Sequence, residues 1–291
     1  MILTVALGGA LALPATAQNV IDLDAPQAQQ QAAARQQLAA QTATTTPTQT
    51  AAQPGEPRQM IMAVAPDRDA PYGKMRLFSR DANGNWTPDS KVMNVNFGRQ
   101  GLAWGIGLHP RQKGQAKREG DWRTPSGLFR VGKVLGNPAQ PPEGFQGWPY
   151  HHKTAADTWP EDPQNKYYNR LYTVPDGYRP AWYEKERFRL DDPAYYYLIV
   201  VDHNRERDSL EETPTSVPGY GSAIFFHTER QHANGKPKPS AGCTTLPRAD
   251  LIEVIRWLEP GSEARYAVLA EKDYRQLWQE WDLPNPELFR N

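Results

Sequence analysis

The chain holds one cysteine, Cys243, which follows a turn of small residues, Ser240-Ala241-Gly242, and a hydrophobic run upstream ends in His227. A free thiol has a pKa of about 8.5 and is mostly protonated near neutrality, so it needs a base to become a nucleophile. A lone cysteine is usually an inert buried residue, and a lone histidine at a strand end is usually structural. Together the two predict acyl transfer, with Cys243 as nucleophile and His227 as general base.

The turn before the cysteine favours the same chemistry. Gly242 has no side chain, so it leaves space beside the sulfur for a substrate backbone. The amides of Cys243 and its neighbours can point at a developing oxyanion, which is the largest single source of stabilisation in most acyl transfers.

The identity of the base leaves alternatives open. His232 is a second candidate, but it lies in a polar loop where a histidine is usually solvated, so His227 is favoured. The other ring nitrogen of His227 needs an acceptor, and Asp202, His203 or a backbone carbonyl remain open choices. No HExxH or CxxC spacing supports zinc, so the sequence predicts neither metal nor cofactor. The residues that raise the zinc alternative are His151, His152, Asp202 and His203.

Three ordered segments resemble one known family. A histidine, a variable loop and then Ser/Thr-x-Gly-Cys is the signature of the L,D-transpeptidase (YkuD-type) family, and here it runs from His227 to Cys243. The segment GDWRTPSGLF at 120–129 resembles the family's Gly-Asp-x-x-Thr-Pro-x-Gly-x-Phe, and GSAIFFH at 221–227 resembles the strand that leads to its histidine. The resemblance covers about residues 60–271, and its three ordered segments argue against a chance match.

This resemblance implies a mainly β fold, a YkuD-like β-sandwich with a few peripheral helices, and a reaction without metal or cofactor. It implies a peptidoglycan L,D-transpeptidase that cross-links donor and acceptor peptide stems through a cysteine thioester. The enzyme would join the third residue of one stem to the third residue of another, or the first residue of one stem to the third residue of another. Cys243 would attack, His227 would take and return the proton, and the backbone amides of Gly242, Cys243 and Thr244 would hold the oxyanion.

The chain departs from the common form of the motif, which is Ser-His-Gly-Cys followed by Ile/Val and then Arg/Asn. Ala241 replaces the histidine, and Thr244-Thr245 replace the pair that often includes an arginine. The Ser-Ala-Gly-Cys-Thr motif favours a divergent branch of this family, which is associated with joining the first residue of one stem to the third residue of another. Two alternatives remain. One is an L,D-carboxypeptidase or peptidoglycan amidase with the same Cys/His pair, and the other is a non-catalytic peptidoglycan-binding protein.

Charged and polar residues near the motifs are candidates for substrate binding. Exposed cations are usually only solvated, yet cations in these loops can meet the carboxylates of peptide stems. The predicted substrate-binding residues are Arg123, Arg230, Ser240 and Thr245, with Lys236 and Lys238 as further cations.

The elements that position these residues are mostly short strands. Composition and alternation predict strands at 60–64, 75–79, 101–108, 127–131, 195–201 and 223–227. Helical spacing predicts one helix at 251–258 behind Pro247 and a second apolar stripe at 274–281. This interpretation places Cys243 just before a helix. The stretch 144–197, rich in Trp and Tyr and without clear period, is predicted to be a packed insertion that flanks the cleft.

The N-terminal part differs from the rest of the chain. Residues 1–17 are apolar and end in Ala15-Thr16-Ala17, a small-x-small pattern typical of signal peptides, so we expect export to the periplasm or cell envelope. The run is too short to remain as an integral membrane span. Residues 18–57, rich in Gln, Ala, Thr and Pro, are predicted to be a disordered tether, and residues 58–291 the catalytic domain.

The overall charge of the chain is balanced. Lys+Arg and Asp+Glu both total 33, so the formal net charge is zero. A chain without a net positive field has little to attract nucleic acid, so nucleic-acid binding is not expected. The working form is expected to be a monomer that binds peptidoglycan stems.

Overall fold

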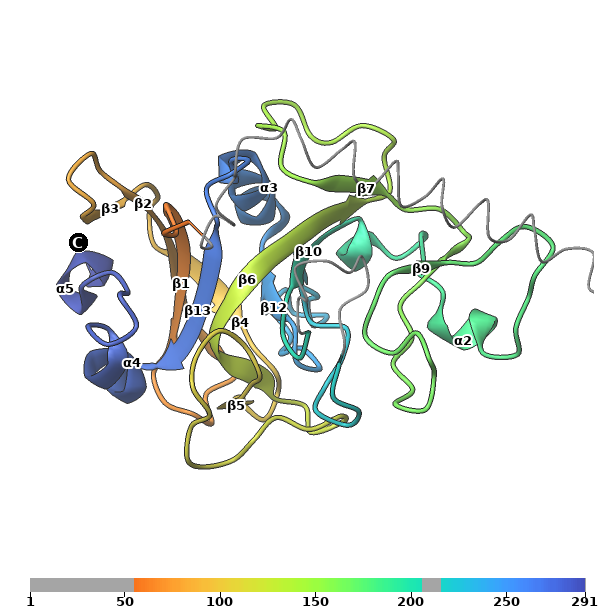
Figure 1. Ribbon diagram of the computed structural model, residues 1–291, viewed down its shortest axis with the longest axis horizontal. Coiled ribbons are helices and arrows are strands. Elements are labelled where there is room, and N and C mark those ends of the chain that lie inside the picture. The colour runs from red at the N-terminus through yellow and green to blue at the C-terminus, as the bar shows by residue number, and fades with distance from the viewer. Residues whose placement is uncertain (1–54, 206–215, 291) are drawn as a thin grey trace, which may run out of the picture. The chain divides into compact units, whose positions relative to one another are not determined.

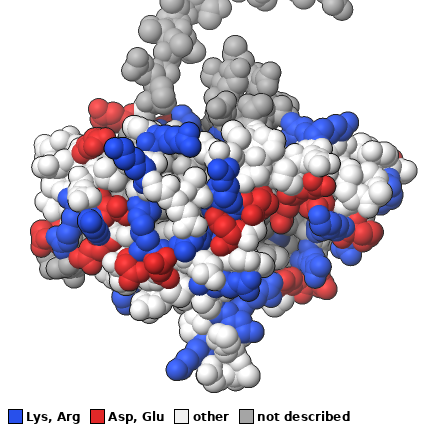
Figure 2. Space-filling view, turned by 90° about the horizontal axis from the view of Figure 1, so that it is seen from below, with Lys and Arg blue, Asp and Glu red and all other residues white. Residues whose placement is uncertain are grey.

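The computed structural model describes residues 55–205 and 216–290. The predicted signal peptide, residues 1–17, and nearly all of the predicted tether, 18–57, lie outside the described residues. Among the described residues, no helix has the length and apolar character needed to cross a membrane. On the face shown in Figure 2, basic and acidic side chains are interspersed, in keeping with the balanced charge.

The described part is built on one sheet that closes on itself (Figure 1). The strand order β1-β13-β6-β10-β11-β12-β4-β2 ends where it began, because β2 also pairs with β1. Closure gives each of these strands two neighbours. The ring strands are β1 (Gln59–Ala65), β2 (Tyr72–Arg80), β4 (Met93–Asn96), β6 (Thr124–Gly136), β10 (Tyr197–Val201), β11 (Phe225–Thr228), β12 (Thr244–Leu246) and β13 (Arg265–Ala270).

Side chains alternate between the two faces of this sheet, as the period of a strand requires. Ile199 on β10 and Phe226 on β11 point into the enclosed core, whereas Leu198 and Phe225 belong to a cluster on the outer face. The alternation that buries Phe226 inside therefore turns the next residue, His227, to the outer face.

Helices and smaller strands cover the ring. Helix α3 (Arg248–Trp257) contributes Leu251, Val254 and Ile255 to the enclosed core. Helix α4 (Glu271–Leu277) lies beside β1 and β13 (Figure 1), and helix α5 (Pro286–Arg290) packs on it through the Tyr274 and Phe289 rings in an outer cluster. The small strands are β3 (Trp86–Pro88), β5 (Leu102–Trp104), β7 (Tyr150–His152), β8 (Asp157–Thr158) and β9 (Tyr172–Thr173).

Residues 137–196, here called the insertion, connect β6 to β10. They include β7 to β9, the short helix α2 (Tyr183–Glu186) and the single 3₁₀ turn η1 (Pro193–Tyr195). Trp159 and Phe188 of the insertion pack with Phe225 and Cys243 in the outer cluster. The insertion therefore lies against the outer face of β10 and β11.

The prediction of a mainly β sandwich with a few helices is confirmed. Several local predictions were wrong. The strand expected at 101–108 shrinks to β5 (Leu102–Trp104), and the helix expected through residue 281 ends at Leu277. Cys243 precedes a strand, β12, and not a helix, because the β-branched Thr244 and Thr245 pair with β11 before α3 begins.

Phe226 should be a principal source of the stability of the ring. Its side chain is fully buried and contacts the Tyr266 ring edge-on at a centroid distance of 4.6 Å. We expect Phe226→Ala to lower the free energy of unfolding by about 3–5 kcal/mol, because it leaves a cavity in a closed core. Urea denaturation measures this loss. Tyr178→Ala, at a half-exposed position, serves as control and should change the value by less than about 0.5 kcal/mol.

Candidate active site

Two parallel strands bring His227 and Cys243 together. In the register of β11 with β12, Phe226 lies beside Thr244 and His227 beside Thr245. Neighbouring strands are about 4.8 Å apart, and residues two apart on a strand share a face. Cys243 and Thr245 therefore face the same outer side of the sheet as His227, with Thr245 directly opposite the histidine and Cys243 two residues before Thr245.

The turn before the nucleophile is fixed by its own hydrogen bonds. Ser240 Oγ donates to the Cys243 carbonyl at 2.5 Å and accepts from the Gly242 amide at 3.0 Å. Gly242 has φ = 150°, and a Cβ there would come within 3.0 Å of the Arg123 carbonyl. The predicted substrate-binding Ser240 thus shapes the turn, and Gly242 is required by backbone conformation and close approach.

The thiol of Cys243 is held in a buried, neutral state. Sγ donates to the carbonyl of Ala223 at 3.4 Å, and burial raises the pKa of the thiol to about 12. Ala223 has φ = 53°, the left-handed conformation that costs a non-glycine residue about 1 kcal/mol. Its amide donates to Asn169 Oδ1 of the insertion at 3.1 Å. The insertion therefore helps to hold the carbonyl on which the thiol rests.

The imidazole of His227 is buried and oriented by a backbone carbonyl. Nδ1 lies 2.9 Å from the carbonyl of Thr228, which can only accept, so Nδ1 carries the proton and Nε2 keeps a lone pair. The Tyr195 ring meets the imidazole edge-on at a centroid distance of 4.8 Å. Burial lowers the pKa of His227 to about 4, so the ring is a neutral proton acceptor near pH 7.

The other groups considered for the base or its orientation are placed elsewhere. Asp202 pairs with Arg205 at 3.1 Å, and His203 lies between the Tyr220 carbonyl and the Ile106 amide. His232 is exposed in its loop. No group of three or more His, Cys, Asp or Glu residues suited to a metal ion occurs in the described part of the chain.

A cavity of about 320 Å³ lies between the insertion and the outer face of β10 and β11. Tyr195, which contacts His227, and Ala223, which accepts from the thiol, both line it. The cavity therefore borders the residues that contact the dyad, while Cys243 and His227 themselves lie behind its wall. Its other lining residues include Trp159, Glu161, Phe188, Asp192, Phe225 and Arg230.

Glu161 gives this cavity an unusual carboxyl group. Its side chain reaches solvent, but the surrounding protein and the nearby carboxylates of Glu186 and Glu119 raise its pKa to about 7. The same carboxylate also contributes to the raised pKa of Cys243. The negative charge of the cavity wall thus acts on the thiol of Cys243.

The remaining predicted substrate-binding residues have different surroundings. The Arg123 guanidinium contacts Asp69 at 3.0 Å and the Leu102 carbonyl at 3.1 Å, so it ties loops together. Arg230 pairs with Asp192 on the cavity wall. Thr245 Oγ1 is buried beside His227 and has no hydrogen-bond partner among the residues described.

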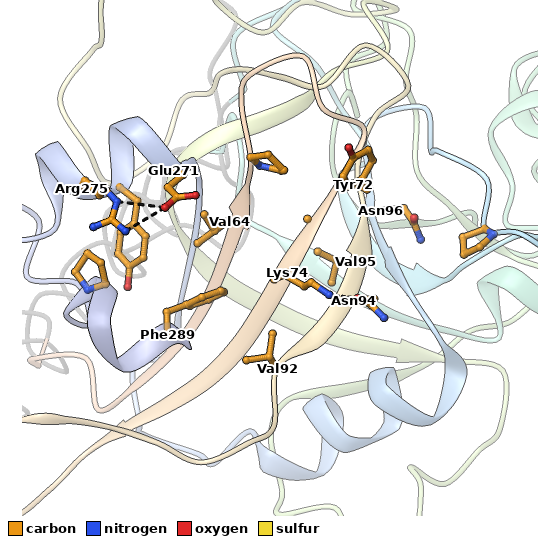
Figure 3. A pocket seen from close by; sticks show the side chains of 15 residues that line it. Val64, Tyr72, Lys74, Val92, Asn94, Val95, Asn96, Glu271, Arg275 and Phe289 are labelled. Atoms are coloured by element: carbon orange, nitrogen blue, oxygen red, sulfur yellow. Dashed lines mark hydrogen bonds and ion pairs between the residues drawn. The ribbon is translucent and has the colours of Figure 1, made fainter. Parts of the chain in front are cut away.

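A larger and mostly apolar cavity of about 720 Å³ lies elsewhere on the ring. Figure 3 shows it between the β1, β2 and β4 strands and helices α4 and α5. Val64, Tyr72 and Phe289 line it, and its Glu271 and Arg275 are paired with each other at 3.1 Å. Neither Ala223 nor Tyr195, the residues that contact the thiol and the imidazole, lines this cavity, so we assign no acyl-transfer chemistry to it.

The match with known proteins agrees with this geometry. A model of the L,D-transpeptidase catalytic domain (YkuD) matches residues 74–266, more than half of the chain. The chain belongs to this family. No curated protein and no solved structure matches the chain at a significant level. Membership of the YkuD family implies a peptidoglycan substrate and an enzyme of the cell envelope.

Several residues around the dyad of this YkuD domain escaped sequence reasoning. Tyr195 was assigned to a strand, yet it belongs to η1 and packs on His227. Asn169 and Glu161 lie in a stretch without period, where no pattern indicates which side chains turn inward. The Asp192-Pro193 pair was the one available signal, because Asp192 caps η1 by accepting from the Ala194 amide at 3.0 Å.

The raised pKa of Cys243 predicts how the thiol reacts with an alkylating agent. A thiol with a pKa of about 12 is neutral near pH 7, so its thiolate fraction rises about tenfold for each pH unit. We expect the rate of iodoacetamide addition, followed by intact-protein mass spectrometry, to rise between pH 7 and pH 9 without a plateau. A plateau below pH 8 would show a preformed thiolate and contradict this assignment. Cys243→Ser is the unlabelled control.

The unpaired hydroxyl of Thr245 predicts an unusual stability change. Thr245→Val removes a buried hydroxyl that lacks a partner, so we expect the free energy of unfolding to stay equal or rise by about 1 kcal/mol. The matched control is Thr244→Val. Its hydroxyl lies 2.6 Å from the Tyr266 hydroxyl, and losing that bond should cost about 1–3 kcal/mol. Urea denaturation compares the two, and an equal loss would refute the assignment.

Proposed function

We propose that this domain is a peptidoglycan L,D-transpeptidase that cross-links peptide stems through a thioester on Cys243. The observation that supports it most is the placement of Cys243 and His227 on one outer face of two paired strands, behind a cavity lined by the residues that contact them. The donor carbonyl belongs to the third or the first residue of one stem. The amine that accepts it belongs to the third residue of another.

In the first half-reaction, the thiol proton passes to Nε2 of His227 as sulfur bonds to the donor carbonyl carbon. Both groups are neutral at rest, since the pKa of the thiol is about 12 and that of the imidazole about 4. Proton transfer therefore accompanies attack and does not precede it. As the tetrahedral intermediate collapses, the C–N bond breaks and the imidazolium gives its proton to the leaving amine.

The oxyanion of that intermediate needs hydrogen-bond donors, and the turn before β12 offers one backbone amide without an acceptor among the described residues. The Gly242 amide already donates to Ser240, and Thr244 is the first residue of β12 in the sheet ladder. The amide of Cys243 has no hydrogen-bond acceptor in the described structure. We therefore assign the Cys243 amide as the main oxyanion donor, with Gly242 and Thr244 fixing its direction.

In the second half-reaction, an amine of the acceptor stem attacks the thioester carbon and gives its proton to His227. The C–S bond then breaks, and sulfur regains a proton. The cavity suits this acceptor, because Glu161 supplies a carboxyl group of pKa about 7 that can bind its ammonium group and take up a proton. Residues 1–17 are the proposed signal for export of this activity to the periplasm.

Intact-protein mass spectrometry with a tetrapeptide stem tests the proposal. Wild type should gain the mass of the donor minus its leaving residue. Cys243→Ala should gain nothing, and His227→Ala should react about 10²–10⁴-fold more slowly. Muropeptide analysis then identifies the product, since cross-linked dimers support a transpeptidase. Shortened stems without dimers would identify a hydrolase, and a Cys243→Ala protein as active as wild type would exclude the thioester.

A further inference from the structure

A tight turn at residues 98–101 lies directly against the turn that carries the nucleophile. The Arg99 amide donates to the Ser240 carbonyl at 3.0 Å, and the Gln100 amide donates to the Trp122 carbonyl at 3.1 Å. Gly101 closes the turn by donating to the Gly98 carbonyl at 2.7 Å. The backbone of Arg99 is therefore tied to the nucleophile turn on one side and to the segment around Trp122 on the other.

Close backbone contacts fix this turn in place. A Cβ on Gly98 would lie 2.3 Å from the Trp122 carbonyl oxygen, and one on Gly101 would lie 2.1 Å from the Arg68 carbonyl oxygen. Gly101 also has φ = 81°, which other residues rarely adopt. Close packing of backbone on backbone thus fixes the position of the Arg99 Cα atom.

The side chain of Arg99 is also held. Its guanidinium carbon lies 3.5 Å from the centroid of the Trp122 ring, and both side chains are exposed. Such a stack orients a guanidinium flat on the ring and leaves the edge of its donor fork open. Trp122 is 41% exposed and has φ = 58°, a left-handed conformation that a bulky residue adopts only under constraint.

Arg99 differs from its neighbours in having no anionic partner. Arg123 contacts Asp69 and Arg230 contacts Asp192, whereas no carboxylate among the described residues pairs with Arg99. A guanidinium that is oriented but unpaired is suited to bind a carboxylate from outside the chain through two parallel N–H···O bonds. An exposed, strained tryptophan beside it gives the same ligand an apolar surface.

Thr124 links the turn that carries Arg99 to the backbone of Cys243. Thr124 Oγ1 accepts from the Gly98 amide at 2.8 Å and lies 3.5 Å from the Cys243 carbonyl. We propose that Arg99, stacked on Trp122, binds a free carboxylate of the donor peptide stem and so places the scissile carbonyl at Cys243. This inference rests on the proposed transpeptidase function, and it names the group of the donor that is recognised.

The test compares two donor peptides, a tetrapeptide stem with free side carboxylates and the same peptide with those groups amidated. The rate of thioester formation is followed by intact-protein mass spectrometry in the full chain. We expect Arg99→Gln to lower kcat/KM about 10- to 100-fold for the carboxylate peptide, the range for losing a charged hydrogen bond. The amidated peptide should change by less than about twofold, and Arg99→Lys should recover part of the loss.

Two controls separate recognition from general damage. Arg111→Gln removes the same charge from an exposed arginine without a described ion pair, and it should leave both rates unchanged. Iodoacetamide should alkylate Cys243 in Arg99→Gln as fast as in wild type, because the dyad is untouched. Trp122→Ala, which removes the ring beneath the guanidinium, should repeat the selective loss.

Each outcome decides the matter. An equal loss for both peptides, or no loss for either, overturns the role of Arg99 while the transpeptidase proposal stands. If wild type forms a thioester with neither peptide but is alkylated normally, the proposed function itself fails, and the inference fails with it.

Discussion

The parallel pairing of β11 with β12 is the constraint on which the site depends. It joins two segments that the loop after Thr228 separates in the chain, and its register puts His227 beside Thr245. A shift by one residue would turn the imidazole or the thiol into the enclosed core, since successive side chains of a strand face opposite ways. Phe226 opposes such a shift, because its buried ring would have to move to the outer face.

The ring and the insertion contribute different things to the site. The closed sheet fixes the backbone of both reactive residues and leaves neither β11 nor β12 at an edge. The insertion supplies the burial, through Tyr195 over the imidazole and Asn169 behind Ala223. Burial is what keeps both reactive groups neutral, so the fold sets the geometry and the insertion sets the protonation state. The cavity between them is lined by residues of both the sheet and the insertion.

The sequence allowed the fold class to be predicted and pointed to Cys243 and His227 as the proposed dyad, because both inferences depend on local patterns. The runs that became β1, β10 and β11 are apolar and β-branched, and the Gly-Cys turn is short and distinctive. The surroundings of the dyad could not be predicted, because they depend on contacts between residues that are far apart in the sequence. The stack of Arg99 on Trp122 joins two loops, and nothing in either loop indicates the other. Arg123 illustrates the same dependence, since its contact with Asp69 joins segments that are far apart in the chain.

The burial of Cys243 has a consequence for survival in an oxidising environment. Peroxide and disulfides react with the thiolate form of cysteine, and this thiol rests protonated on the Ala223 carbonyl. The chain also holds no second cysteine with which a disulfide could form within it. A buried thiol that rests protonated is in the form least open to damage. The same burial that slows the reaction of the thiol at rest therefore also protects it from oxidation.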